Sequence, residues 1–327
     1  MTKKNIAIVA GGDSGEYEIS INSASLVKDN LSKDIYNSYI IHIKGVEWTY
    51  KSSQGEIFIV DKNDFSIIIN GKKITFDCVF NAIHGTPGED GKLQGYLEML
   101  KIPITSCDQY TSALTFNKFM CNKFVSALGI DLASSWLLKK QDFIKDILPE
   151  DITFPCFVKP NKGGSSVGIS KVNEKKFLKE ALEIAFREDN EVLIEEFIDG
   201  TEISCGLFTT NGKLMVLPLT EIVSKNEFFD YEAKYTKGMA DEITPARISE
   251  KIENECKIIS SFLYNQFNCK GIVRIDFILS SNKLFFIEVN TVPGFSEASI
   301  VPKQVKEMGI SLKDLFGGTI EEALNNY

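Results

Sequence analysis

Short apolar runs alternate with polar stretches along the first third of the chain. Residues 6–10 form a continuous apolar run, so residues 5–10 are predicted to be a buried strand, and residues 39–43 and 78–83 are predicted to be further strands. A weak helical periodicity follows the first run over residues 19–31. Strands that alternate with helices predict a doubly wound βα domain over residues 1–106, whose loops gather at one edge of the sheet.

The loops after the first and third predicted strands, residues 11–16 and 84–91, are polar and rich in glycine. In a doubly wound layer, ligands bind beyond the carboxyl ends of the strands, so these loops are candidates for a site. Neither loop has the dinucleotide fingerprint G-x-G-x-x-G. Glu16 lies on the first loop, where its position alone favours a solvated carboxylate that complements the dipole of the following helix.

The middle of the chain contains a long helical pattern and then a pair of predicted strands. Residues 111–128 place apolar side chains on one stripe. Lys118 borders that stripe, which by itself is usual for a lysine that keeps its ammonium in water. Residues 154–160 and 169–172 are the two strands, and Lys159 lies near the end of the first.

The loop between these two strands, residues 161–168, contains three glycines and two serines. A flexible loop of this kind can close its N–H groups and hydroxyls over phosphate oxygens, while a lysine supplies the opposite charge. The alternative is an ordinary hairpin turn, which would not need so long a polar loop.

An amphipathic helix over residues 174–186 and a strand over residues 192–194 come next. The strand continues into residues 195–198, a segment that could hold an adenine ring at a hinge between two domains. Glu202 could reach a ribose hydroxyl or face water.

Residues 203–208 and 214–222 are predicted to be paired strands. Residues 226–244, which follow them, are polar and aromatic without a clean periodicity, and are predicted to form a long loop. Such loops in compact domains are usually functional. This one contains Lys234 and Tyr235.

Two apolar runs near the end of the chain carry oxygen ligands. Residues 272–278 and 284–290 flank a serine- and asparagine-rich turn and are predicted to form a hairpin. Because residues two apart in a strand face the same side, Asp276, Glu288 and Asn290 are expected to lie together. Such an all-oxygen set suits Mg²⁺ or Mn²⁺ held jointly with phosphates. The alternative is a surface hairpin with ordinary charges, although charges inside apolar strands are costly unless paired or coordinated.

Composition limits the possible classes of protein. The chain has 327 residues, of which 43% are hydrophobic and 25% charged, as in an ordinary globular protein of two or three domains. The net charge of −9 argues against non-specific nucleic-acid binding. Seven cysteines without a C-x-x-C pair argue against a zinc ribbon or a redox motif. With no signal sequence and no membrane span, these thiols predict a cytoplasmic protein.

Residues 164–168 match the G-x-S-x-G elbow of serine hydrolases. That elbow opens a helix and needs a downstream histidine, whereas His42 and His84 both lie upstream and a strand pattern follows. A P-loop pattern is also absent. The remaining set is two lysines, a glycine–serine loop, an oxygen-ligand cluster, and Arg274 two residues from Asp276. This set suits phosphoryl transfer, in which cations neutralise charge and a loop excludes water.

With these motifs in place, the chain resembles the D-alanine–D-alanine ligase family of the ATP-grasp superfamily over essentially its whole length. The motifs, in order, are Gly11-Gly12-Asp13-Ser14-Gly15-Glu16, His84-Gly85, Glu89-Asp90-Gly91, Lys159-Pro160, Gly164-Ser165-Ser166-Val167-Gly168, Asp230-Tyr231-Glu232-Ala233-Lys234-Tyr235, Arg274-Ile275-Asp276, Glu288-Val289-Asn290-Thr291 and Pro293-Gly294. The resemblance implies an α/β substrate domain over residues 1–106, a central ATP-grasp subdomain over residues 107–194, and a C-terminal ATP-grasp and metal-binding domain over residues 195–327, with ATP held between the last two.

The resemblance also implies a role for each matching residue, and it replaces the solvent-facing interpretations of Glu16 and Lys118. The residues implied to hold ATP are Lys118, Lys159 and Lys234 at the phosphates, Glu195, Glu196 and Ile198 at the adenine, and Glu202 at the ribose. The residues implied to bind two Mg²⁺ or Mn²⁺ ions are Asp276, Glu288 and Asn290. At the first D-alanine, Glu16 is implied to hold the ammonium, with His84 beside the substrate. Glu16, Ser165 and Tyr235 are implied to form a hydrogen-bonded set. Arg274 and the Gly294 N–H are implied to form the oxyanion site, and Ser299 to bind the second carboxylate.

The activity that the resemblance implies is ATP-dependent joining of two D-alanines through an acyl phosphate, for peptidoglycan precursor synthesis, by a protein that is usually a homodimer. Tyr235 favours D-alanine as the second substrate, because relatives that use D-lactate lack this tyrosine. Phe229, Glu196 and Ala298 depart from residues frequent in the family, which affects loop packing and adenine contacts. Two alternatives stay open. One is another ATP-grasp carboxylate–amine ligase with a different second substrate, and the other is a non-catalytic nucleotide-binding protein, which would be expected to have lost Arg274 or a metal ligand.

Overall fold

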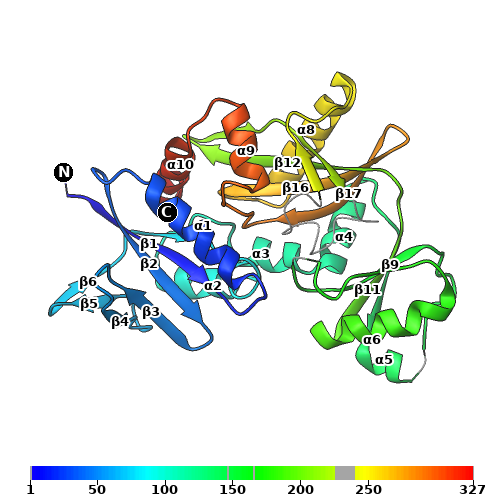
Figure 1. Cartoon of the computed structure of the whole chain (residues 1–327), viewed down its shortest axis with the longest axis horizontal. Coiled ribbons are helices and arrows are strands. Elements are labelled where there is room, and N and C mark those ends of the chain that lie inside the picture. Colours follow the sequence, from blue (N-terminus) through cyan, green and yellow to red (C-terminus); the bar gives the residue numbers. More distant parts are fainter. Residues whose placement is uncertain (1, 146, 165, 225–239, 327) are drawn as a thin grey trace.

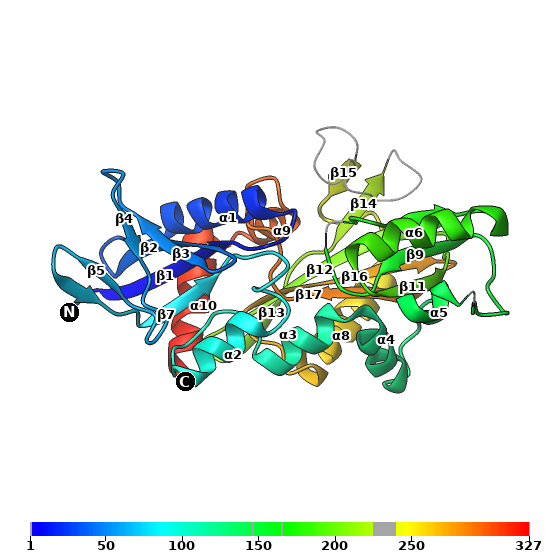
Figure 2. The same cartoon turned by 90° about the horizontal axis from the view of Figure 1, so that it is seen from below.

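The computed structural model describes residues 2–145, 147–164, 166–224 and 240–326, and the strands form three main sheets along the length of the molecule (Figure 1). In the view of Figure 2, the five-stranded sheet lies at one end, the four-stranded sheet at the other, and the six-stranded sheet between them. This is the mixed α/β architecture that the sequence predicts.

The first sheet has the strand order β4-β3-β2-β1-β7. Its strands are β1 (Lys4–Gly11), β2 (Tyr36–Lys44), β3 (Glu47–Lys51), β4 (Ile57–Ile59) and β7 (Cys78–Asn81). β1 is parallel to β2 and β7, as predicted, whereas β3 and β4 add antiparallel strands at one edge. A separate hairpin of β5 (Ile67–Ile69) and β6 (Lys72–Ile74) packs near β4. These four short strands are not predicted from the sequence, because three to five residues are too few for a clear periodicity.

Residues 6–10 of strand β1 are all apolar, and both faces of this stretch are covered. Ile6, Ile8 and Ala10 belong to the core that contains residues of α1 (Tyr17–Asn30) and α10 (Leu312–Asn325). Ala7 and Val9 belong to the core on the other face, with residues of α2 (Lys92–Met99). Parallel strands that are buried on both faces read as continuous hydrophobic runs. The C-terminal helix therefore packs on the N-terminal sheet, and the division of the chain at residues 106 and 194 stays a prediction.

The second sheet is antiparallel, with the strand order β10-β9-β11-β8. Its strands are β8 (Ser135–Lys139), β9 (Cys156–Pro160), β10 (Ser170–Val172) and β11 (Glu191–Glu196). The helices beside it are α5 (Lys140–Ile144), a 3₁₀ turn (Lys175–Phe177) and α6 (Leu178–Glu188). The two strands predicted on either side of the glycine–serine loop are confirmed as β9 and β10, and the helix over residues 174–186 is confirmed as the 3₁₀ turn and α6.

The third sheet has the order β15-β14-β12-β16-β17, with β13 also paired to β12. Its strands are β12 (Thr201–Thr210), β13 (Lys213–Val216), β14 (Thr220–Ser224), β15 (Ala240–Ile243), β16 (Ile272–Ser280) and β17 (Lys283–Asn290). The helices of this region are α8 (Glu250–Gln266) and α9 (Ile300–Glu307). The hairpin predicted over residues 272–278 and 284–290 is confirmed as β16 and β17, whose connecting residues Ser281 and Asn282 both have positive φ.

The helix predicted over residues 111–128 is wrong in one respect, because the structure has two helices there. α3 (Gln109–Phe116) and α4 (Lys118–Ala127) are separated by Asn117, which is extended, with ψ of 98°. The Asn117 side chain accepts a hydrogen bond from the Met120 N–H and so caps α4. Asn161, at the start of the glycine–serine loop, donates to the same Asn117 oxygen over 3.0 Å. A distant residue therefore stabilises the break.

The strand predicted over residues 214–222 is likewise two strands, β13 and β14, which pair with successive parts of β12. Pro218 lies between them and has no N–H to donate to a sheet. Among the helices in the described ranges, none has the length and apolar character to cross a bilayer.

Candidate active site

A cavity of about 800 Å³ is lined by residues of the second and third sheets, of α1, and of the loops that follow β1 and β7. The sequence-predicted residues that line it are Glu16, His84, Lys118, Lys159, Glu195, Glu196, Ile198, Glu202, Arg274, Glu288, Asn290, Gly294 and Ser299. Asp276 is buried beside Arg274 and Asn290. Ser165, Lys234 and Tyr235 lie outside the described residues, as does the departure at Phe229. The departure at Ala298 lines the same cavity.

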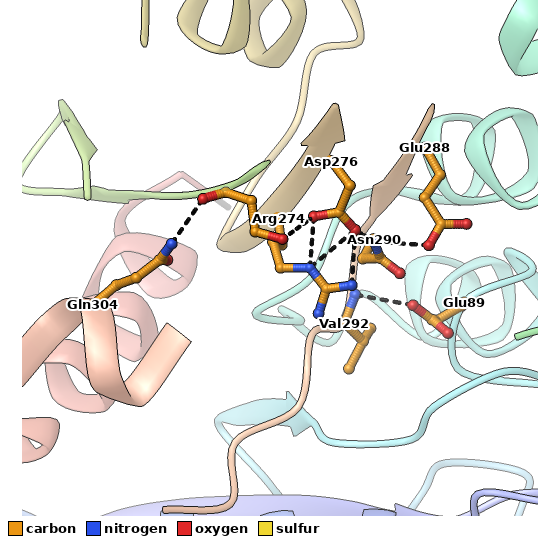
Figure 3. A network of polar contacts seen from close by, with 8 residues as sticks. Glu89, Arg274, Asp276, Glu288, Asn290, Val292 and Gln304 are labelled. Atoms are coloured by element: carbon orange, nitrogen blue, oxygen red, sulfur yellow. Dashed lines mark hydrogen bonds and ion pairs between the residues drawn. The ribbon is translucent and has the colours of Figure 1, made fainter. Parts of the chain in front are cut away.

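The register of the third sheet places the oxygen ligands side by side. Asp276 on β16 lies opposite Glu288 on β17, and Arg274 lies opposite Asn290. The Asn290 amide nitrogen donates to Asp276 Oδ2 over 2.9 Å and to Glu288 Oε1 over 3.4 Å (Figure 3). The predicted clustering of these three side chains is thus confirmed, and the cause is the pairing of the two strands.

Arg274 and Asp276 form a buried two-point ion pair. The guanidinium donates from Nε and Nη2 to the Asp276 carboxylate at distances of 2.8–3.1 Å (Figure 3). Burial opposes the charge of the guanidinium, but the attraction of Asp276, and then of Glu288, raises the pKa of Arg274 above its usual value. Arg274 therefore keeps its positive charge at the cavity.

Two residues that the sequence analysis did not single out support Asp276 from behind. The Ser204 hydroxyl, on the neighbouring strand β12, donates to Asp276 Oδ1 over 2.6 Å. Gln304 on α9 in turn donates its amide to the Ser204 carbonyl over 3.0 Å. Both are fully buried. No local pattern marks such residues in a sequence, because their partners come from other elements.

The donor set fits a hard divalent cation. Among the described residues, no group of three or more His, Cys, Asp and Glu side chains could hold a metal. The set here is instead two carboxylates and one amide, Asp276, Glu288 and Asn290. Asn290 uses its nitrogen for both carboxylates, so its oxygen is the atom that suits a metal. Few protein oxygens supplemented by phosphate oxygens are typical of Mg²⁺ sites.

The two described lysines of the predicted phosphate site face the cavity from different elements. Lys159 on β9 donates to Glu195 on β11 over 2.6 Å, and both side chains are largely buried. Asn122 on α4 also donates to Glu195, over 3.3 Å. Lys118, at the first residue of α4, donates to the Gly163 carbonyl over 2.6 Å, and so connects α4 to the glycine–serine loop.

Residues 195–198 lie at the end of β11, where the adenine was expected. Glu196 accepts a hydrogen bond from the Ser134 N–H over 3.3 Å. The Phe197 ring packs against Phe157, with centroids 5.7 Å apart, and the Lys171 ammonium lies 4.1 Å from its centroid. This aromatic and cationic surrounding is compatible with a flat base.

The glycine–serine loop approaches the Glu16 carboxylate. Glu16 is the N-cap residue of α1, and a Cβ atom on Gly164 would lie only 2.8 Å from Glu16 Oε2. Ser299 is the N-cap residue of α9, and a Cβ on Gly294 would lie 2.7 Å from its hydroxyl. A side chain at Gly164 or Gly294 would therefore displace the Glu16 carboxylate or the Ser299 hydroxyl from its position.

His84 is buried between the first sheet and the loop after β17. Its Nδ1 lies 2.8 Å from the Val292 carbonyl and its Nε2 lies 3.2 Å from the Ser23 hydroxyl. Burial lowers the pKa of His84. Because a carbonyl only accepts hydrogen bonds, the neutral ring carries its proton on Nδ1.

Glu89 belongs to the motif Glu89-Asp90-Gly91 and has no role predicted from the sequence. It lines the cavity and accepts hydrogen bonds from the Gly85 N–H over 2.7 Å and the Val292 N–H over 3.2 Å. Removal from water, followed by the charge of Glu16, raises the pKa of Glu89 from 4.5 to about 8. The signal that could have found it is an acidic residue in a glycine-rich loop at the carboxyl end of a predicted strand.

The raised pKa of Glu89 predicts a pH-dependent stability. Between 4.5 and about 8 the folded protein holds a proton on Glu89 that the unfolded chain has lost. The contribution of Glu89 to the free energy of unfolding is therefore fully present below pH 4.5. It declines by about 1.4 kcal/mol per pH unit until about pH 8. Glu89→Gln, which resembles the protonated acid, should lack this slope. Urea unfolding from pH 5 to 8 in EDTA would measure the difference, and parallel slopes for both proteins would contradict the assignment.

The chain is similar to known proteins along nearly its whole length. Residues 5–107 match the family described as D-ala D-ala ligase N-terminus, and residues 124–321 match D-ala D-ala ligase C-terminus. The D-alanine--D-alanine ligase of Flavobacterium johnsoniae is 49% identical over 98% of this chain and 99% of its own length. The corresponding protein of Bacteroides fragilis is 44% identical, with the same coverage.

Solved structures of ligases are also similar to this chain along nearly its whole length. The VanG D-Ala:D-Ser ligase from Enterococcus faecalis is similar with a TM-score of 0.88 and 33% identity, over 98% of this chain and 100% of that one. The D-alanine--D-alanine ligase from Bacillus anthracis complexed with ATP has a TM-score of 0.78 and 28% identity, over 99% and 98% of the two chains.

Proposed function

The chain belongs to the D-alanine–D-alanine ligase family, and from this premise we propose which of its residues carry out each part of the reaction. The activity is ATP-dependent ligation of two D-alanines to D-alanyl-D-alanine, a step of peptidoglycan synthesis. The observation that carries the assignment of residues is the cluster of Arg274, Asp276, Glu288 and Asn290 at one cavity.

In the first step, a carboxylate oxygen of the first D-alanine attacks the γ-phosphorus of ATP, and the bond from that phosphorus to ADP breaks. Lys118 and Lys159 would neutralise the phosphates, which their positions at the cavity support. Glu16 would hold the substrate ammonium, with His84 beside it.

The nucleotide's other end would lie along β11 and β12. Glu195 and the backbone of Glu196 and Ile198 would bind the adenine, and Glu202 the ribose. All four line the cavity, and the aromatic surrounding of Phe197 supports a base at this place.

Asp276, Glu288 and Asn290 would hold Mg²⁺ or Mn²⁺. When bound, such ions neutralise the charge that develops on the transferring phosphoryl group. The Arg274 side chain and Ser204 fix the orientation of Asp276 beforehand, so that the carboxylate does not need to reorganise during the reaction.

In the second step, the amine of the second D-alanine attacks the acyl carbon and gives a tetrahedral oxyanion. The C–O bond then breaks, phosphate leaves, and the amine loses a proton. Arg274 and the Gly294 N–H would stabilise the oxyanion, and Ser299 would bind the second carboxylate. The roles of Ser165, Lys234 and Tyr235 rest on the resemblance alone, because these residues lie outside the described part of the chain.

The resemblance further supports a homodimer that works in the cytoplasm. Sedimentation of the purified protein at micromolar concentration would test the dimer, and a monomer throughout that range would contradict it.

Phosphate release from Mg-ATP by the purified protein tests the function. We expect release that D-alanine stimulates at least about tenfold over the background with L-alanine, which cannot place its methyl group and ammonium in the same site. Mass spectrometry should identify D-alanyl-D-alanine as the product. ATP binding without D-alanine-stimulated release would overturn the substrate assignment and leave only the fold.

D-serine is the second candidate for the second substrate, because the E. faecalis protein named above is a D-Ala:D-Ser ligase. The same assay with equal D-alanine and D-serine, and separately with D-lactate, would decide. If the product with D-serine or D-lactate forms in larger amount than D-alanyl-D-alanine, the proposed specificity for D-alanine as second substrate would be wrong.

A further inference from the structure

The loop after β17, residues 292–295, leaves the third sheet and enters the N-terminal core. The Phe295 ring packs edge-on against Phe80 of β7 and Phe316 of α10, with centroids 5.7 and 5.8 Å apart. Val292 and Phe295 are buried, at 3% and 2% exposure. The middle of this loop carries Gly294, the proposed oxyanion donor.

Side chains of α1 and of the loop after β7 hold both ends of residues 292–295. The Phe295 N–H donates to the Ser23 hydroxyl over 3.2 Å. Ser23 then donates its own proton to Nε2 of His84, over 3.2 Å, because the neutral ring carries its proton on Nδ1. Nδ1 of His84 donates to the Val292 carbonyl over 2.8 Å. This chain of hydrogen bonds starts and ends on the same four-residue loop, and every donor in it has one acceptor.

A third side chain fixes the first residue of the loop from the other direction. Glu89 accepts the Val292 N–H over 3.2 Å, while its second oxygen accepts the Gly85 N–H of its own loop. Pro293 has no N–H. Among the described residues, Gly294 is then the one position of this loop whose amide is not committed to a protein acceptor.

We propose that Ser23, acting through His84, is a positioning residue that holds residues 292–295 so that the Gly294 amide faces the reacting carbonyl. Only the orientation of the Gly294 amide toward the reacting carbonyl rests on the proposed function. The hydrogen bonds that hold residues 292–295 do not depend on it. His84 is thereby assigned a structural task, besides its place next to the substrate. Ser23 belongs to α1, so the N-terminal domain would shape an oxyanion site on the C-terminal part of the chain.

Ser20 offers a matched control for Ser23. It lies on the same helix and is also fully buried. Like Ser23, its hydroxyl accepts one backbone N–H and donates to one acceptor. Its partners are the Gly11 N–H, over 2.8 Å, and the Ala82 carbonyl, over 2.7 Å, both within the N-terminal sheet and its loop. Ser23→Ala and Ser20→Ala therefore remove similar hydrogen bonds, but only the first releases the loop 292–295.

The first measurement is amide hydrogen exchange of a peptide that covers residues 288–299. Ser23→Ala should speed its exchange by about tenfold relative to wild type, as expected when one buried hydrogen bond is lost, and Ser20→Ala should leave it unchanged. Equal exchange in wild type and Ser23→Ala, or equal acceleration by both variants, would overturn the proposal. If Ser23→Ala does not fold, Ser23→Cys, with a weak donor and acceptor of similar size, gives the same comparison.

The second measurement is the ratio of phosphate released to dipeptide formed at saturating D-alanine. An acyl phosphate that is attacked slowly by the amine is lost to water, so the ratio should rise from about one in wild type to about two or more in Ser23→Ala, and stay at about one in Ser20→Ala. Faster exchange with an unchanged ratio would overturn the positioning of the Gly294 amide. A wild type that forms no dipeptide would overturn the proposed function instead, while the exchange measurement would still decide whether Ser23 holds the loop.

Discussion

Glu288→Gln should lower D-alanine-dependent phosphate release by about a thousandfold or more. The substitution keeps the size of the side chain but removes one of the two carboxylates that face Asn290. A metal bound at these residues supplies several kcal/mol of transition-state stabilisation, and about 4 kcal/mol corresponds to this factor. Phosphate release under saturating Mg-ATP, together with Mn²⁺ binding followed by electron paramagnetic resonance, would measure the effect.

The fold should survive this substitution, because Glu288 is only partly buried and its strand remains paired. Glu321→Gln is a matched control. It removes a partly buried carboxylate that pairs with Lys4 and Tyr36, away from the residues that line the cavity. We expect it to change thermal stability more than turnover. Turnover of Glu288→Gln within a few-fold of wild type would remove the metal assignment.

Arg274→Lys should lower turnover by about a hundredfold to a thousandfold, the range found when one oxyanion donor is lost. Lysine keeps the positive charge but cannot offer two donors in a fixed plane. Asp276 would lose one arm of its two-point contact, and the guanidinium proposed to stabilise the oxyanion would be absent. Steady-state phosphate release would report the loss, and it should appear in kcat rather than in KM for ATP.

Arg247→Lys is the control for the loss of a two-point contact between a guanidinium and a carboxylate. Arg247 also binds a carboxylate through Nε and Nη2, that of Glu221, at 2.9 and 2.8 Å. Its side chain is 63% exposed, against 17% for that of Arg274, so water can satisfy the donors that lysine leaves out. Arg247 and Glu221 also line the cavity, but neither has an assigned role in the reaction. Turnover should therefore change by less than about threefold. If Arg247→Lys were as harmful as Arg274→Lys, a general loss of ion pairing would explain both and the oxyanion role would not stand.

Local patterns were enough to predict the hairpin that carries the oxygen ligands. The alternation of residues along a strand and the turn composition at Ser281 and Asn282 are properties of neighbouring residues, and they placed Asp276, Glu288 and Asn290 on one face. The family followed from the ordered motifs. In both cases the information lies within short stretches of chain.

Local patterns were insufficient where a distant residue competes with them. The apolar stripe over residues 111–128 continues through Asn117, yet the helix breaks there. The Asn161 side chain donates to Asn117 and accepts the Phe119 N–H, and its carbonyl accepts the Lys118 N–H. Three contacts from a loop more than 40 positions away outweigh the local preference for one helix.

The sequence by itself determined the chemistry of this protein: which oxygen donors and cations it has, and which family it belongs to. Only the tertiary structure decided how the backbone around that chemistry is held. Ser23 and Phe295 are 272 positions apart, and Glu89 and Val292 are 203 apart. Their contacts exist because two separately predictable segments pack against one core, and packing between distant segments leaves no periodicity or spacing in either of them.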